Sequence, residues 1–329
     1  MNERPDLDND GAERDDLVRT RTFDAEGTLD IDVDITVGRV DIKLGDSDSG
    51  DSGDSGDSGD SGGSAGCSVT VRHDPTADAP WAEGVSNLLN WVGERFGSQF
   101  GGTVGAEFNG SPADAVRRAT IEKAGNRLVV RAAKPLPLRN VPLAVTITAP
   151  AGSNLRVHTG SAAIAVAGTT GRLDLATGSG YVSAEKADGA ATVRTGSGSV
   201  RLGPVPGGLQ LRSGSGDVEV VALRGSATVA TGTGDVWLGE TSGQVLVRTS
   251  SGSLTVADAA EGSVEATTGA GNVRVGVRTG VAAEIELSSG SGQVVSELDV
   301  AEAPPAGAVP LSVRARTGSG DAVVSKAAS

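Results

Sequence analysis

A repeat of 18 residues is the feature that most restricts what this chain can fold into. Six segments of the same pattern each begin 18 residues after the last, at Thr159, Thr177, Thr195, Ser213, Thr231 and Thr249. A second glycine recurs inside the unit, at Gly171, Gly189, Gly207, Gly225 and Gly243. A constant period of this kind predicts one supersecondary unit stacked many times along a single axis.

Two short runs of alternating apolar residues lie between these glycines. Val200 and Leu202 represent the first run, and Leu209 and Leu211 the second. Residues two apart share one face of a strand, so each coil contributes two half-buried strands. The glycines suit tight corners that need positive φ. The pattern therefore predicts an all-β solenoid with an 18-residue coil, and it fits two long sides or three short ones.

The period is interrupted in the last third of the chain. Gly262 comes one residue late, and two further turns, at 289–292 and 317–320, follow longer insertions. One insertion is the Pro-rich stretch 303–310. Insertions in solenoids form loops without disturbing the stack, so we expect the coils to continue to the end.

The sequence outside the regular repeat divides into distinct parts. We predict a disordered N-terminal segment at 1–21, first solenoid strands at 22–45 and an acidic Asp-Ser-Gly linker at 46–66. A mixed region with a strand, a helix and a hairpin follows at 67–140, and the regular solenoid at 141–329. Within the mixed region, 82–100 has apolar residues at helical spacing and predicts one short amphipathic helix. This helix would cap an open end of the solenoid or dock a partner, and we favour the cap.

Composition narrows the function classes. Aromatic residues make up only 2% of the chain, which predicts a thin core of Val, Leu, Ile and Ala. The net charge of −14 argues against nucleic acid and anionic lipid as partners. A single cysteine excludes an internal disulfide and argues against structural zinc. The charged N-terminus and the lack of a long apolar run lead us to expect a cytoplasmic protein without direct membrane insertion.

No motif in the sequence predicts a metal site or a cofactor. The Gly-Ser-Gly-Asp turns at Asp217, Asp235 and Asp321 are similar to those of calcium-binding β-rolls. Calcium rolls repeat their loops every nine residues, whereas these turns recur every 18 and have Tyr181 or Ser199 at the equivalent position in other coils. The turns therefore predict corners and no calcium cage.

Catalytic groups are equally sparse. The chain has two histidines, His73 and His158, and one cysteine, Cys67, with no spacing that places a nucleophile beside a base. We predict that the protein is not an enzyme. A carbohydrate-active β-helix is kept as an alternative, because an outward ladder of arginines could line a groove.

Candidate interaction residues come from aromatic and arginine positions. They are Trp81, Trp91, Phe96, Trp237, Arg194, Arg212 and Arg248. Trp91 and Phe96 lie on the predicted helix and Trp81 directly precedes it, while the arginines, with Arg316, recur at the last position of the coil. A solubilising surface is the simpler interpretation of the arginines, and Trp237 has no companion aromatic in sequence.

The turns of the form T-G-S-G-x-V, the segment Val-Thr-Ile-Thr-Ala-Pro-Ala-Gly-Ser at 145–153 and the opening Gly38-Arg39-Val40 resemble the bacterial putative-adhesin family, also called the toast-rack domain. The resemblance covers most of the chain from Phe23 onward. It implies a right-handed β-solenoid without an established activity. Some relatives are envelope-associated and linked to stress sensing, which the resemblance extends to this chain as an expectation.

These observations predict a non-enzymatic β-solenoid scaffold or protein-interaction module, with a protein partner or a second copy of itself. A self-assembling structural rod is the first alternative. The segment 322–325 suggests this alternative, because we expect it to form the free edge of the last coil and it carries little charge to block pairing with another strand.

Overall fold

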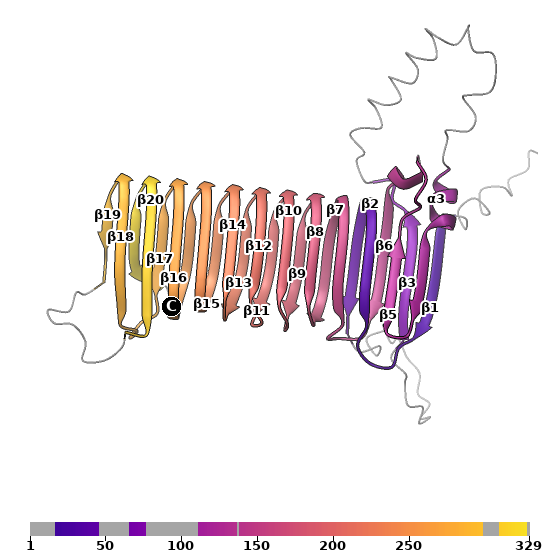
Figure 1. Ribbon diagram of the computed structural model, residues 1–329, viewed down its shortest axis with the longest axis horizontal. Coiled ribbons are helices and arrows are strands. Elements are labelled where there is room, and N and C mark those ends of the chain that lie inside the picture. Colours follow the sequence, from indigo (N-terminus) through magenta and orange to yellow (C-terminus); the bar gives the residue numbers. More distant parts are fainter. Residues whose placement is uncertain (1–16, 46–65, 77–110, 137, 299–308, 328–329) are drawn as a thin grey trace, which may run out of the picture.

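The computed structural model describes residues 17–45, 66–76, 111–136, 138–298 and 309–327. They form a long rod of stacked strands with short connections (Figure 1). The predicted helix at 82–100 lies outside these residues. The acidic linker at 46–66 does too, except Gly66, which begins a strand.

Two facing layers of parallel strands build the regular part of the rod. Layer 1 contains β8 (Leu173–Ser179), β10 (Ala191–Ser197), β12 (Leu209–Ser215) and β14 (Ala227–Thr233). Layer 2 contains β9 (Val182–Ala187), β11 (Val200–Val205) and β13 (Val218–Arg224). The long strands β7 (Asn154–Thr170), β15 (Val236–Ser251) and β16 (Leu254–Ala270) contribute to both layers. Each coil therefore has two sides.

The strand register matches the sequence period, because equivalent residues of successive coils pair with each other. Leu209 pairs with Ala191 on one side and Ala227 on the other, each 18 residues away along the chain. Between Thr241 and Ser242 the pairing of β15 with β16 shifts by one residue. This irregularity accounts for the late arrival of Gly262.

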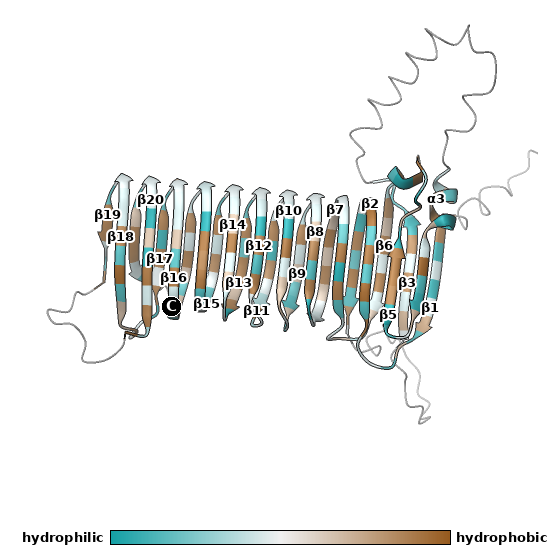
Figure 2. Ribbon diagram, viewed as in Figure 1, coloured by the Kyte–Doolittle hydropathy of each residue, from teal (hydrophilic) through white to brown (hydrophobic). Residues whose placement is uncertain are grey.

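The core lies between the two layers. Inward side chains such as Val193, Leu211 and Val220 are fully buried and belong to one continuous cluster of mostly Val, Leu, Ile and Ala. Figure 2 shows apolar and polar residues alternating along the strands. The thin aliphatic core expected from the low aromatic content is confirmed.

The corners explain the Thr-Gly-Ser-Gly pattern. The buried Thr195 hydroxyl donates a hydrogen bond to the Ser197 carbonyl at 3.0 Å, which closes the turn. Gly198 has φ of 116°, and a Cβ there would lie 2.2 Å from the carbonyl oxygen of Gly180 in the preceding coil. A side chain is therefore excluded at this corner by both conformation and space.

The N-terminal end departs from the simple stack. It contains β1 (Val18–Asp24), β3 (Gly66–His73) and β6 (Leu143–Ala149), paired antiparallel in layer 2. The expected hairpin is confirmed as β4 (Thr120–Ala124) and β5 (Arg127–Arg131) in layer 1. The single long strand β2 (Asp30–Leu44) lies between β5 and β6 on one side and β7 on the other. The segment 22–45, predicted to hold the first solenoid strands, contains the end of β1 and all of β2, and β2 lies inside the stack.

Two short helices at this end were not predicted. Helix α3 (Pro112–Arg118) packs against β1 and β3, and it buries Ala115 and Val116. The 3₁₀-helix η1 (Leu138–Asn140) lies in the connection between β5 and β6.

The C-terminal end also departs from chain order. It contains β17 (Val273–Val277), β18 (Ala283–Ser291), β19 (Val294–Ser296), β20 (Leu311–Ser319) and β21 (Ala322–Lys326). Strand β20 lies between β16 and β18, and β21 lies between β17 and β19 (Figure 1). The expectation that 322–325 is a free edge was therefore wrong, because β21 is paired on both sides.

Candidate functional site

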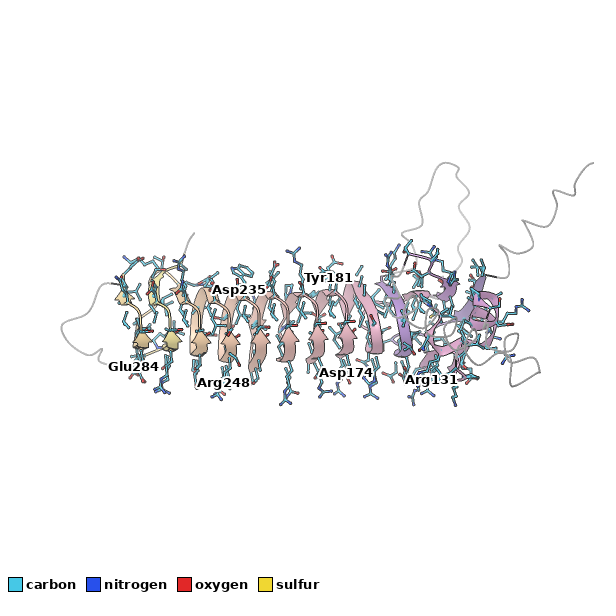
Figure 3. All side chains as sticks on the ribbon, turned by 90° about the horizontal axis from the view of Figure 1, so that it is seen from above. Arg131, Asp174, Tyr181, Asp235, Arg248 and Glu284 are labelled. Carbon is cyan, nitrogen blue, oxygen red and sulfur yellow. The ribbon has the colours of Figure 1, made fainter. Side chains whose placement is uncertain are left out.

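The predicted interaction residues lie on opposite faces of the rod. Arg194, Arg212 and Arg248 project outward from layer 1, and Trp237 projects outward from layer 2. Figure 3 shows this division, with Asp174 and Arg248 on one side and Tyr181 on the other. Trp81, Trp91 and Phe96 lie outside the described residues. The candidate residues that the structure describes therefore lie on two separate surfaces.

The outer face of layer 1 is charged. Its arginines mostly contact carboxylates of neighbouring coils, in the pairs Arg127–Asp32 at 2.8 Å, Arg156–Asp174 at 3.4 Å, Arg248–Glu265 at 3.3 Å and Arg316–Glu286 at 2.6 Å. Exposed pairs of this kind contribute only about 0–1 kcal/mol each. These contacts fit the interpretation of a solubilising surface for most of this face.

Two arginines of this face differ from the rest. Arg194 and Arg212 are register neighbours, and the ladder is interrupted beyond them by Ala230 before it reaches Arg248. Neither Arg194 nor Arg212 forms an ion pair with a described residue. Together with His158 they line a shallow depression of about 630 Å³. The arrangement can attract an anion, but the surrounding floor is open and built from corner residues.

The outer face of layer 2 carries exposed large apolar side chains. Trp237 is 40% exposed, and Tyr181 and Val221 are each 44% exposed. Arg201, Glu219 and Trp237 occupy the same position in three successive coils. Tyr181, Arg201 and Trp237 line a depression of about 630 Å³. We call the set Tyr181, Arg201, Val221, Trp237 and Gly239 the tryptophan face.

A glycine shapes the floor of this face. A Cβ on Gly239 would lie 3.1 Å from Cη2 of Trp237 and 2.1 Å from the Val221 carbonyl oxygen. The indole therefore lies against the strand beside Val221, in space that a side chain at 239 would take. A second hollow of about 540 Å³ shares Arg201 and Val221 and has a floor of small residues, including Ala165, Ala167 and Gly203.

The charge on this face is only partly balanced. The Arg201 guanidinium contacts the Glu219 carboxylate at 2.7 Å, and this hydrogen bond raises the pKa of Arg201 above its ordinary value. The pair fixes two side chains between the aromatic rings. Asp217 and Asp235 line the same depression, so an approaching surface meets a net negative centre with apolar groups on both sides.

The groups considered for catalysis are not brought together. Cys67 is fully buried in β3, and burial raises the pKa of its thiol, which keeps it protonated. His73 ends the same strand, whereas His158 lies on the outer face of layer 1. Among the described residues no group of three or more His, Cys, Asp or Glu side chains could hold a metal ion.

The acidic corners have a structural task. The Asp217 carboxylate accepts a hydrogen bond from the backbone N–H of Asp235 at 3.0 Å, and Asp235 accepts one from Ser253 at 2.7 Å. Each carboxylate therefore links its corner to the corner of the next coil. This use accounts for Asp at these turns without a bound cation.

Sequence reasoning missed most of the tryptophan face. Tyr181, Val221 and Gly239 come from three different coils, and each is unremarkable within its own coil. The strand register could have predicted part of it, because the 18-residue period places Arg201, Glu219 and Trp237 in one row. Trp237 thus has a companion aromatic in space although it has none nearby in sequence.

None of the helices in the described part of the chain is long and apolar enough to cross a membrane.

Comparison with known proteins gives a match to one family model and matches to several solved structures. Residues 145–304 match the family model described as Toastrack DUF4097. A putative adhesin from Bacteroides fragilis NCTC 9343 is 13% identical, with 94% of this chain and 96% of that chain covered and a TM-score of 0.38. A putative adhesin from Parabacteroides merdae ATCC 43184 is 10% identical, with coverage of 94% and 95% and a TM-score of 0.31. No curated protein matches the chain.

Proposed function

The chain belongs to the Toastrack DUF4097 family through residues 145–304, and from this premise we propose that it is a non-enzymatic protein-interaction module. Its binding surface in this proposal is the tryptophan face. The partner is a protein whose surface offers an apolar pocket for the Trp237 ring. The predicted cytoplasmic location stays a prediction.

The observation that carries the proposal is the gathering of exposed apolar groups on one face. Trp237, Tyr181 and Val221 are large, exposed and separated by only a few coils of the same layer. Trp, Tyr and Arg are the residue types that most often dominate the energy of protein interfaces. Exposed apolar groups that gather within a polar rim mark interaction sites, whereas single scattered ones need no explanation.

The stiffness of the scaffold supports the same conclusion. Strand β13 is paired with β11 on one side and β15 on the other, so the backbone beneath the face is held in register. The indole ring is further held against the strand above Gly239. A surface that is already ordered loses little conformational entropy on binding.

Affinity capture with matched variants tests the proposal. The double variant Trp237→Ala, Tyr181→Ala removes both rings, and we expect at least about 30-fold weaker retention of the partner, the effect of losing one interface hot spot of about 2 kcal/mol. The control is Thr228→Ala on the outer face of layer 1, which should retain the partner as the original chain does.

A partner that the double variant retains as strongly as the original chain contradicts the tryptophan face as the binding surface. Loss of the partner with Thr228→Ala, and not with the double variant, would move the site to layer 1. Circular dichroism of each variant establishes that the β-solenoid is intact.

A further inference from the structure

The C-terminal end of the rod leaves part of the core exposed. The last coil is formed by β18 and β19, whose inward side chains include Ile285, Leu287 and Val294. Val294 is 50% exposed, whereas Ala322, its neighbour one coil inside, is fully buried. Ile285 and Leu287 are likewise only partly buried. The apolar interior therefore continues to the surface at this end.

The backbone of this coil is also unsatisfied on one side. Among the described residues β18 pairs with β20 alone, and β19 pairs with β21 alone. Each strand therefore presents a free row of N–H and C=O groups next to exposed apolar side chains. A row of this kind is a template for pairing with another strand.

The opposite end is closed by the chain itself. Helix α3 adds Ala115 and Val116 to the core cluster, and both are fully buried. The Arg19 guanidinium donates hydrogen bonds to the carbonyl oxygens of Arg117 at 2.8 Å and Ala119 at 2.7 Å. These contacts hold the end of α3 in place against β1. Among the described residues β1 pairs with β3 alone and β4 with β5 alone, so strand edges are free here too, but the core beneath them is covered.

We propose that the β18–β19 end is a homodimer interface at which two copies of this chain pack end to end. A two-fold axis normal to the layers places β18 against β18 and β19 against β19, antiparallel in both layers. The two free edges and the open core of one copy then meet the same features of the other. Such an isologous contact is self-complementary and closes at two subunits.

The charges near the edge permit this contact. The Glu286 carboxylate projects from β18 and contacts Arg314 at 2.7 Å and Arg316 at 2.6 Å. Both arginines neutralise the charge that two facing β18 strands would otherwise bring together. A second copy is also the occupant whose two layers match this end in spacing and in strand length. Because α3 covers the apolar core at the other end, that end lacks the exposed core that this contact needs, and assembly stops at the dimer.

Analytical ultracentrifugation of the full chain tests the interface. The chain has a mass of 32.6 kDa, and we expect a species of twice that mass that dissociates on dilution. Leu287→Lys places a charge on the inward side of β18 and should raise the dimer dissociation constant by about 100-fold or more. Ser312→Lys is the control, because it adds the same charge to the outer face of β20, one coil inside, and should leave the constant within about threefold.

A second variant keeps the test decisive if Leu287→Lys fails to fold. Val294→Asp changes a side chain that is already half exposed in the single chain, so the coil should tolerate it. It should weaken the dimer as Leu287→Lys does. A chain that is monomeric at every concentration overturns the proposal, as does growth beyond two subunits. Dimers that survive both edge variants would also overturn it.

Discussion

The two ends of the solenoid share an inserted strand, but they differ in how the apolar core is covered. At each end a strand from a distant part of the sequence lies inside the stack, β2 near the N-terminal end and β20 with β21 near the C-terminal end. The N-terminal end is then closed by antiparallel strands and α3. The C-terminal end stops at β18 and β19 with its core partly exposed.

This difference shows that fastening the last coils to the rod and covering the end of the rod are independent of each other. An out-of-order strand is paired on both sides, so it ties the last coils to the rod. It does not cover the final edge. The core at the end must be covered as well, and this needs an element that breaks the repeat, such as α3 with its buried Ala115 and Val116. The last coils are fastened at both ends, whereas the core is covered at only one.

The largest effect is expected from removing the inserted strands at the open end. Deletion of 309–327 removes β20 and β21, which are the described strand partners of β18 and β19. We expect 283–296 to lose its structure together with the deleted strands, while the rod up to β16 stays folded. Limited proteolysis with mass spectrometry checks this. Persistent protection of β18 in the truncated chain would contradict the inserted arrangement.

A matched pair of core truncations compares the ends directly. Ile121 in β4 is 1% exposed at the closed end, whereas Ile285 in β18 is only partly buried at the open end. We expect Ile121→Ala to lower the free energy of unfolding by about 3 kcal/mol, because it leaves a cavity. Ile285→Ala should cost about 1 kcal/mol in the monomer.

Urea unfolding of both variants, at a protein concentration where the chain is monomeric, measures this difference. Ile121→Val serves as the milder control and should cost about 1 kcal/mol. Equal losses for the two alanine variants would mean that the ends are covered alike.

The smallest effect is a pH dependence confined to the open end. Hydrogen bonds from Arg316 and Arg314 lower the pKa of Glu286 below its ordinary value. A carboxyl whose pKa is lower in the folded state stabilises the fold above its unfolded pKa, and this contribution is lost as the pH falls through the folded pKa. We therefore expect the last coil to loosen slightly below about pH 4.

The pH dependence is measured by amide exchange in β18 across that range. Glu286→Gln should remove this part of it, and Glu284→Gln on the same strand is the matched control. An unchanged pH profile in Glu286→Gln would show that the arginine contacts do not stabilise this coil.

Much of the regular rod could be predicted from the sequence, because each coil is specified by residues close together in the chain and the same pattern recurs in every coil. The 18-residue spacing from Thr177 to Thr249, the corner glycines and the alternating apolar pairs each specify one part of a coil. The one-residue insertion before Gly262 was also visible, and it appears as the register shift after Thr241.

The order of the last coils could not be predicted. The turns at Ser289–Gly292 and Thr317–Gly320 carry the same pattern, so either could follow the coil that ends at Gly271. Long connections let the chain place the later coil first, and no local residue preference distinguishes the two orders. The tryptophan face was missed for a related reason, since it depends on register between coils.

Hydrogen–deuterium exchange of the intact chain at several dilutions tests the central difference between the ends most directly. The account predicts slow exchange at every concentration in 127–131, the strand β5, which is paired on both sides. It predicts that 283–296 exchanges faster than the middle of the rod in the monomer and becomes protected as the concentration rises. Protection of 283–296 equal to that of β12 in the dilute monomer would contradict an open C-terminal end.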